Sequence, residues 1–145
     1  MKHPILWIFG NTGAGKTTLA KEFVRRFGAF HLDGDILQKE TGNFDMSPAG
    51  RRCRCLGAAK EAERLCVLGP VVVSMITPYE DLRMQIKELV DPLFIYLPYG
   101  KPASVENPFE EPIIEHFVHN RVAKTVSFTA SGCYFVERPR HVVVP

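Results

Sequence analysis

Apolar and polar residues follow one another along the chain in blocks that predict alternating strands and helices. Four short runs are apolar over most of their length: residues 5–9, 29–32, 71–76 and 93–97. The third run is β-branched at its start and lies between Pro70 and Pro78. Such runs are typical of strands in a parallel sheet that is covered on both faces.

Between these runs, apolar residues recur every three or four positions, which predicts helices. We expect one helix from Thr17 to about Phe27, a second from Ser47 to about Leu68, and a third from Thr77 to Val90, with Leu82, Ile86, Leu89 and Val90 on its apolar face. Residues 36–44 predict a short helix and a loop. Strands that alternate with helices predict an α/β fold in three layers, a mainly parallel sheet flanked by helices, with right-handed crossovers.

The last third of the chain has a weaker pattern. An apolar stripe that includes Ile113 and Phe117 predicts a helix from Glu111 to Lys124. Residues 126–136 alternate loosely around Ser131-Gly132, which suits an antiparallel hairpin, and a single fifth strand is the alternative. The tail from residue 138 to 145 is expected to become ordered only by docking. We expect residues 1–145 to form one domain, because a chain of this length can build a single core.

A glycine-rich segment, GNTGAGKT from Gly10 to Thr17, joins the first predicted strand to the first predicted helix. It fits the phosphate-loop pattern, in which glycines let several backbone N–H groups surround one anion at a helix N-terminus. In such a loop Lys16 reaches the terminal phosphates and the Thr17 hydroxyl lies on a Mg²⁺ that bridges them. A plain glycine turn is the alternative, and the strand and helix on either side disfavour it.

Two carboxylates, Asp33 and Asp35, follow the second predicted strand. If that strand continues through them, their side chains face the same side at its carboxyl end, where ligands bind in open α/β sheets. Near a Mg-nucleotide, carboxylates can hold metal-bound water or take a proton from an attacking hydroxyl. Solvated turn residues are the alternative interpretation.

Three arginines, Arg51, Arg52 and Arg54, lie in the first turns of the helix that starts at Ser47. A solvated basic face is the usual explanation of such a cluster. Because this helix follows the carboxylates, anion binding is the second interpretation.

Composition narrows the class of protein. The chain is 46% hydrophobic and 23% charged, as in soluble globular proteins, and its net charge of +2 gives little reason to expect a nucleic acid or a membrane as partner. Four cysteines without a CxxC pair indicate free thiols in a reducing compartment, so we expect a cytoplasmic protein. The sequence leaves a homodimer open.

Taken together, these segments resemble the adenylylsulfate kinases. The shared segments, in the same order, are the phosphate loop, Leu32-Asp33-Gly34-Asp35, Met46-Ser47-Pro48 with Arg51, Val72 to Tyr79, and Asn107 to Pro112. The resemblance covers roughly residues 4 to 112. It implies a P-loop kinase fold and transfer of the γ-phosphoryl group of ATP to the ribose 3′-hydroxyl of adenylylsulfate, with ATP and Mg²⁺ as cofactors.

The resemblance also implies roles for particular residues. ATP is expected to bind Gly10, Asn11, Thr12, Gly13, Ala14, Gly15, Lys16, Thr17 and Thr18. The catalytic residues are expected to be Lys16, Asp33 and Asp35, with Thr17 and Asp33 on the metal. The acceptor is expected to contact Asp35, Phe44, Arg51, Arg54, Ile76 and Thr77.

The chain departs from the family pattern on the acceptor side. Gln38 stands where the family has Arg, Met46 where it has Phe, Arg54 where it has Asn, and Thr77 where it has Ser. The family's long basic lid is replaced by residues 98–106, in which Lys101 is the sole cation. These differences keep two alternatives open: a kinase of another hydroxyl acceptor, such as a metabolite or a modified nucleoside, or a nucleotide-binding regulator with weak catalysis.

Overall fold

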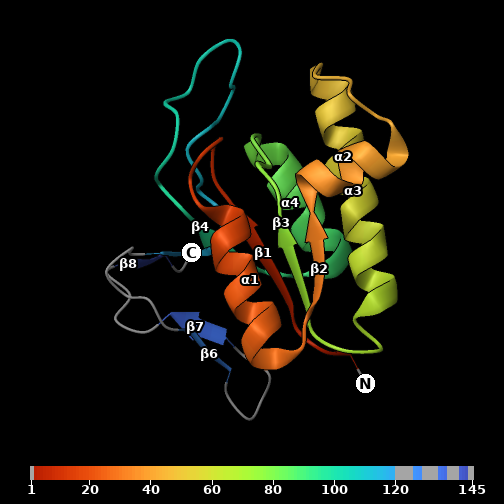
Figure 1. The fold of residues 1–145 in the computed structure, drawn as a ribbon. Helices are drawn as coiled ribbons and strands as arrows, with labels where there is room; N and C mark the ends of the chain where they lie inside the picture. The colour runs from red at the N-terminus through yellow and green to blue at the C-terminus, as the bar shows by residue number, and fades with distance from the viewer. Residues whose placement is uncertain (1, 120–125, 129–133, 137–140, 144–145) are drawn as a thin grey trace.

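Five parallel strands and one antiparallel edge strand form the main sheet of the computed structural model, which describes residues 2–119, 126–128, 134–136 and 141–143 (Figure 1). Within these residues the strand order is β2-β3-β1-β4-β5-β8. The strands are β1 Ile5–Phe9, β2 Phe30–Asp33, β3 Val71–Ser74, β4 Leu93–Tyr96, β5 His116–Val118 and β8 His141–Val143. The central strand β1 pairs with β3 on one side and with β4 on the other.

Helices cover both faces of this sheet, as predicted. The helices are α1 Lys16–Phe27, α2 Gly34–Thr41, α3 Pro48–Leu65 and α4 Glu80–Val90. Leu6 and Ile8 of β1 pack with α1, whereas Trp7 and Phe9, which point to the other face, pack with α3 and α4. All residues of β1 are buried, which explains its unbroken apolar run.

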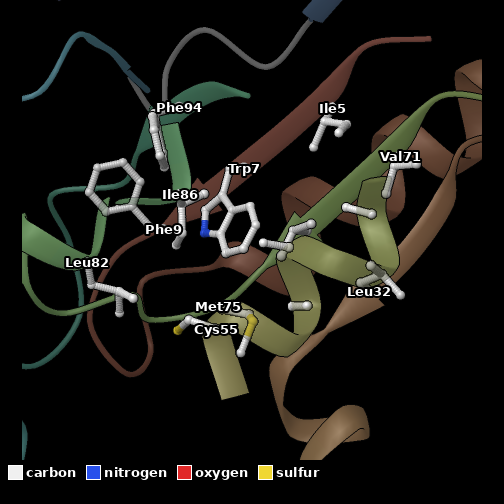
Figure 2. Packing of buried hydrophobic residues seen from close by; sticks show 14 of the residues in the cluster. Ile5, Trp7, Phe9, Leu32, Cys55, Val71, Met75, Leu82, Ile86 and Phe94 are labelled. Atoms are coloured by element: carbon white, nitrogen blue, oxygen red, sulfur yellow. The ribbon is translucent and has the colours of Figure 1, made fainter. Parts of the chain in front are cut away.

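The larger core cluster lies between β1 and the pair α3 and α4. Trp7 and Phe9 stand at its centre, with Phe94 edge-on to Phe9 and with Leu82 and Ile86 of α4 against them (Figure 2). Leu89 was predicted on the same apolar face, but it is 48% exposed, because the buried stripe of α4 is formed by Leu82, Arg83 and Ile86.

The prediction of a helix from Glu111 to Lys124 is wrong. Residues 111–115 are irregular and His116–Val118 form β5, parallel to β4; residues 120–124 lie outside the described residues. The Glu80 carboxylate accepts hydrogen bonds from the backbone N–H groups of Ile113 and Ile114, so these groups do not take part in a helix. Ile113, placed in the predicted apolar stripe, is 77% exposed.

The two strands of the predicted hairpin are confirmed. β6, Val126–Phe128, pairs antiparallel with β7, Tyr134–Val136, and the turn between them lies outside the described residues. In the tail, β8 pairs antiparallel with β5, which is the docking that the tail was expected to require. No helix in the described part of the chain has both the length and the apolar character to span a membrane.

Candidate active site

A cavity of about 340 Å³ opens at the carboxyl ends of β2 and β3, beside the loop that follows β1. Its lining comes from the phosphate loop, the start of α2, α3 and the segment after β3. Of the predicted site residues, those that line it are Thr12, Gly13, Gly15, Lys16, Thr17, Thr18, Asp33, Asp35, Arg51, Arg54, Ile76 and Thr77. The fold therefore brings both halves of the predicted site to one cavity.

The phosphate loop has the backbone shape that its glycines allow. Gly13 and Gly15 have φ angles of 82° and 98°, a region that residues with a Cβ rarely adopt. The Lys16 ammonium donates to the carbonyl of Asn11 at 3.0 Å. Burial lowers the pKa of Lys16, and the nearby carboxylates of Asp35 and Asp33 oppose this shift.

Gly10, Asn11 and Ala14 do not line the cavity, although they belong to the loop. Asn11 is buried; its Nδ2 donates to the carbonyls of Lys101 and Asn107, and its Oδ1 accepts from the Thr12 amide. Asn11 thus holds the loop against residues 101–107, a contact between segments about ninety positions apart.

Asp33 accepts three hydrogen bonds. Its Oδ2 accepts from the hydroxyls of Thr17 (2.7 Å) and Ser74 (3.1 Å), and its Oδ1 accepts from the amide of Asp35 (2.9 Å). Burial alone would raise the pKa of Asp33, but these hydrogen bonds outweigh burial and lower it below its ordinary value of 3.8. The side chain is an ionised carboxylate held in one orientation beside Thr17.

Asp35 lies in α2, so the prediction that it continues the strand is wrong. The strand ends at Asp33, which caps the N-terminus of α2, and Asp35 is the second residue of that helix. It still reaches the cavity, because α2 begins at the sheet edge where the cavity opens. Asp35 is exposed there, whereas Asp33 is 5% exposed.

Replacing Asp33 by Asn is expected to lower the free energy of unfolding of the ligand-free protein by about 1–3 kcal/mol near pH 7. Because the folded-state pKa of Asp33 is lowered, its stabilising contribution is present above the unfolded pKa of about 3.8 and is lost as the pH falls through the folded value. Urea unfolding of both proteins near pH 7 and near pH 3 measures this. An equal difference at both pH values would show that Asp33 is not ionised in the folded protein.

Thr77 forms part of the cavity wall in an unusual conformation. Its φ angle is 50°, in the left-handed region, which costs a β-branched residue about 1–3 kcal/mol. Its hydroxyl accepts a hydrogen bond from Trp7 Nε1 at 2.8 Å and donates to the carbonyl of Met75 at 3.2 Å. Cys55 also lines the cavity, and burial raises its pKa to about 12, so its thiol stays protonated.

Two of the three clustered arginines line the cavity. Arg51, only 8% exposed, donates to the carbonyls of Met46 (2.8 Å) and Glu106 (3.4 Å). Arg54 donates to the carbonyls of Asn43 and Asp45. Arg52 does not line the cavity: it pairs with Asp81 at 2.8 Å and lies over the ring of Tyr79.

Phe44 is not placed in the cavity. It is 61% exposed and is not part of the lining, and its contact with an acceptor stays a prediction. Met46, two residues later, does line the cavity, as does Gln38. These are the positions at which the family pattern has Phe and Arg.

Sequence reasoning did not single out Ser74 as a site residue. The Ser74 hydroxyl contacts both Asp33 and His31. His31 Nε2 lies 2.8 Å from Ser74 Oγ. Since ionised Asp33 can only accept, the single Ser74 proton points to Asp33, and His31 Nε2 must then donate to Ser74. The sequence did carry a signal for Ser74: it is a polar residue that ends a buried apolar strand, beside a carboxylate.

The adenylylsulphate kinase family matches the chain over residues 2–105. This chain belongs to that family. Since the family consists of kinases, and the cavity contains a phosphate loop, the chain is an ATP-dependent P-loop kinase that acts on a hydroxyl group. No curated protein matches the chain significantly.

Solved structures of kinases share the fold. A mutant form of the APS kinase CysC of Mycobacterium tuberculosis is 23% identical, with a TM-score of 0.61 over 71% of this chain and 82% of that one. A structure of that kinase in complex with AMPPNP and APS is 21% identical, with a TM-score of 0.62 over 72% of this chain and 65% of that one. A gluconokinase from Sinorhizobium meliloti is 21% identical, with a TM-score of 0.53 over 68% and 58%. The chain thus covers less than two thirds of the latter two structures.

Proposed function

We propose that this kinase transfers the γ-phosphoryl group of ATP to a hydroxyl of a small anionic acceptor, with adenylylsulfate as the first candidate. One observation carries the proposal: Lys16 of the phosphate loop, two carboxylates and two arginines open onto the same cavity. Family membership and the AMPPNP and APS bound by a similar structure support the choice of both substrates.

The phosphate loop and the start of α1 form the nucleotide half. The backbone N–H groups of the loop and the helix N-terminus attract the phosphates, and the Lys16 ammonium neutralises their charge. Lys16 now bonds the carbonyl of Asn11 within the loop, a contact it can exchange for a phosphate oxygen. Phosphate binding would favour the charged lysine and so offset the effect of burial on its pKa.

The residues beside Lys16 fit a Mg²⁺ ion. Thr17 Oγ1 and Asp33 Oδ2 lie 2.7 Å apart and are both oxygen donors, the ligand type that Mg²⁺ prefers. Within the described residues, no three His, Cys, Asp or Glu side chains are grouped to enclose a metal, which suits an ion that takes most of its ligands from phosphates and water. When bound, Mg²⁺ would neutralise charge on the β- and γ-phosphates.

Asp35 is assigned to the acceptor hydroxyl. Asp33 already accepts three hydrogen bonds and is held by Thr17 and Ser74, so it is suited to fix the metal side. Asp35 does not cap α2 and is exposed in the cavity, so it can accept the proton that leaves the hydroxyl as the oxygen attacks the γ-phosphorus. The β–γ bridging oxygen leaves with ADP.

Arg51 and Arg54 are assigned to the anionic group of the acceptor. A guanidinium binds an oxyanion through two parallel hydrogen bonds, and both arginines line the same cavity as the phosphate loop. A kinase of another hydroxyl acceptor is the second candidate, because Gln38, Met46 and Arg54, which differ from the family pattern, all line this cavity. The likeness to a gluconokinase shows that a kinase named for a different substrate shares the fold.

Arg51→Ala and Arg54→Ala are each expected to weaken acceptor binding about 10–100-fold, because each removes charge-assisted hydrogen bonds. Nucleotide affinity should be unchanged, since neither residue belongs to the phosphate loop. Isothermal titration with adenylylsulfate and other anionic acceptors, in the presence of AMPPNP, measures both constants. Arg52→Ala is the matched control, because Arg52 lies on the same helix and does not line the cavity. Wild-type affinity for every acceptor in both variants would remove the arginines from the site.

We further propose that residues 1–145 act as one kinase domain. A cytoplasmic location and a homodimer stay predictions.

A further inference from the structure

Arg83 of α4 is a fully buried cation directly behind the cavity wall. It is 0% exposed, and its guanidinium lies beside the stacked rings of Phe9 and Phe109, with its central carbon 4.8 Å from each ring centroid. Burying a guanidinium is unfavourable unless its donors are satisfied and it is paired with charge or aromatic faces. The groups that contact the Arg83 guanidinium therefore indicate its role.

The guanidinium joins the cavity wall to a distant segment. Its Nε donates to the carbonyl of Thr77 at 2.9 Å, and its NH2 group donates to the carbonyl of Glu110 at 2.8 Å. Its NH1 group pairs with the Glu80 carboxylate at 3.0 Å. A planar fork can hold two carbonyls and a carboxylate at once, which the single ammonium of a lysine cannot do in the same geometry.

The segment that Arg83 holds, residues 106–114, contacts several parts of the site and is called the strap below. At its start, Glu106 accepts from Arg51, and Asn107 accepts from Asn11 of the phosphate loop. In its middle, the amide of Glu110 donates to the carbonyl of Pro78 at 2.8 Å. The strap therefore touches the nucleotide loop, an acceptor arginine and the wall beside Thr77.

Thr77 is the residue most dependent on this arrangement. Its left-handed φ of 50° is unfavourable for threonine and persists only if its surroundings hold it. Trp7 holds its hydroxyl and Arg83 holds its carbonyl. Loss of the bond from Arg83 would leave a buried carbonyl unpaired and would let Thr77 relax toward an ordinary conformation, which moves the wall of the cavity.

We propose that Arg83 is a positioning residue for the acceptor side of the site: it fixes Thr77 and the strap, and through them the wall and the arginine that the acceptor contacts. The proposal rests on the proposed function for its effect on turnover. Arg83 does not line the cavity and touches neither substrate. Its removal should therefore affect acceptor binding much more than nucleotide binding.

The test compares Arg83→Lys with Arg52→Lys. Each arginine pairs with a carboxylate in the first turn of α4 and lies beside an aromatic ring, but Arg52 bonds Asp81 and has no bond to Thr77. For each variant we would measure kcat, KM for the acceptor, the dissociation constant for AMPPNP, and the fluorescence emission of Trp7. Trp7 is the sole tryptophan of the chain and bonds Thr77, so its emission reports directly on the wall.

Arg83→Lys is expected to raise KM for the acceptor by about tenfold or more, the factor that about 1.4 kcal/mol represents, while nucleotide affinity changes by less than about twofold. Trp7 emission should shift, and Arg52→Lys should match the wild type in every measurement. A folded Arg83→Lys protein with wild-type KM for the acceptor and wild-type Trp7 emission overturns the proposal. Equal losses of nucleotide and acceptor binding overturn it too, since they indicate a role in stability alone.

If Arg83→Lys does not fold, Phe109→Leu carries the same test, because Phe109 is only partly buried and its loss removes one of the two rings that the Arg83 guanidinium contacts. If the wild-type protein phosphorylates no acceptor, the proposed function fails by itself. Trp7 emission and AMPPNP binding then still decide whether Arg83 fixes Thr77.

Discussion

Asp35→Asn is expected to lower the rate of phosphoryl transfer by about 10²–10⁴-fold, the range that a general base contributes. The amide keeps the size of the side chain but cannot take the proton of the acceptor hydroxyl. Asp35 stands in the cavity beside the phosphate loop and does not form part of it, so the dissociation constant for ATP should stay within about threefold.

Single-turnover transfer and AMPPNP titration separate these two effects. Glu40→Gln is the matched control, since Glu40 lies in the same helix and is exposed outside the cavity lining. Asp33→Asn should also slow transfer, because Asp33 orients the Thr17 hydroxyl, and its loss should appear as a higher Mg²⁺ requirement. Wild-type transfer rates in both variants would leave Asp33 with the capping of α2 alone and would remove Asp35 from the reaction.

Lys16→Ala is expected to abolish the stabilisation that the nucleotide gives to the folded protein. A ligand at about 100 times its dissociation constant stabilises by about 2.7 kcal/mol, so the wild-type Tm should rise clearly with MgATP and the variant's should not. Burial lowers the pKa of Lys16, which means that folding disfavours its charged form. The ligand-free variant should therefore be no less stable than the wild type.

Thermal melts with and without MgATP measure both effects, and Lys21→Ala serves as control, because Lys21 is exposed on the same helix and does not line the cavity. A full nucleotide-dependent shift in Lys16→Ala would place the nucleotide elsewhere on the protein.

Local patterns predicted the nucleotide half of the fold well. The apolar run of β1, the glycine loop and the spacing of Leu19 and Phe23 in α1 each act over a few residues, so the sequence displays them directly. The segment after β4 was harder, because its conformation depends on contacts from afar. Glu80 holds the amides of Ile113 and Ile114, a constraint that no periodicity within residues 111–124 shows.

The same division applies to the site. Lys16, Thr17 and Asp33 were predicted together, and the structure brings them to one cavity. The contact of Asn11 with Asn107 and the three bonds of Arg83 were not predicted, because they join residues that are far apart in the chain. The burial of Arg83 was also hard to predict because the residue is charged. Pattern reasoning assigns an arginine within a helix to the solvent face, whereas here the side chain is buried against two phenyl rings.

The most direct test of the central claim is an acceptor screen with ATP labelled at the γ-phosphate, in which the mass and the label of each product are measured. We expect label to move to adenylylsulfate or to another small anionic alcohol in the wild-type protein, and to fail to move in Asp35→Asn. Label that appears only as inorganic phosphate, at the same rate with and without each acceptor, would contradict the claim and would favour a nucleotide-binding regulator.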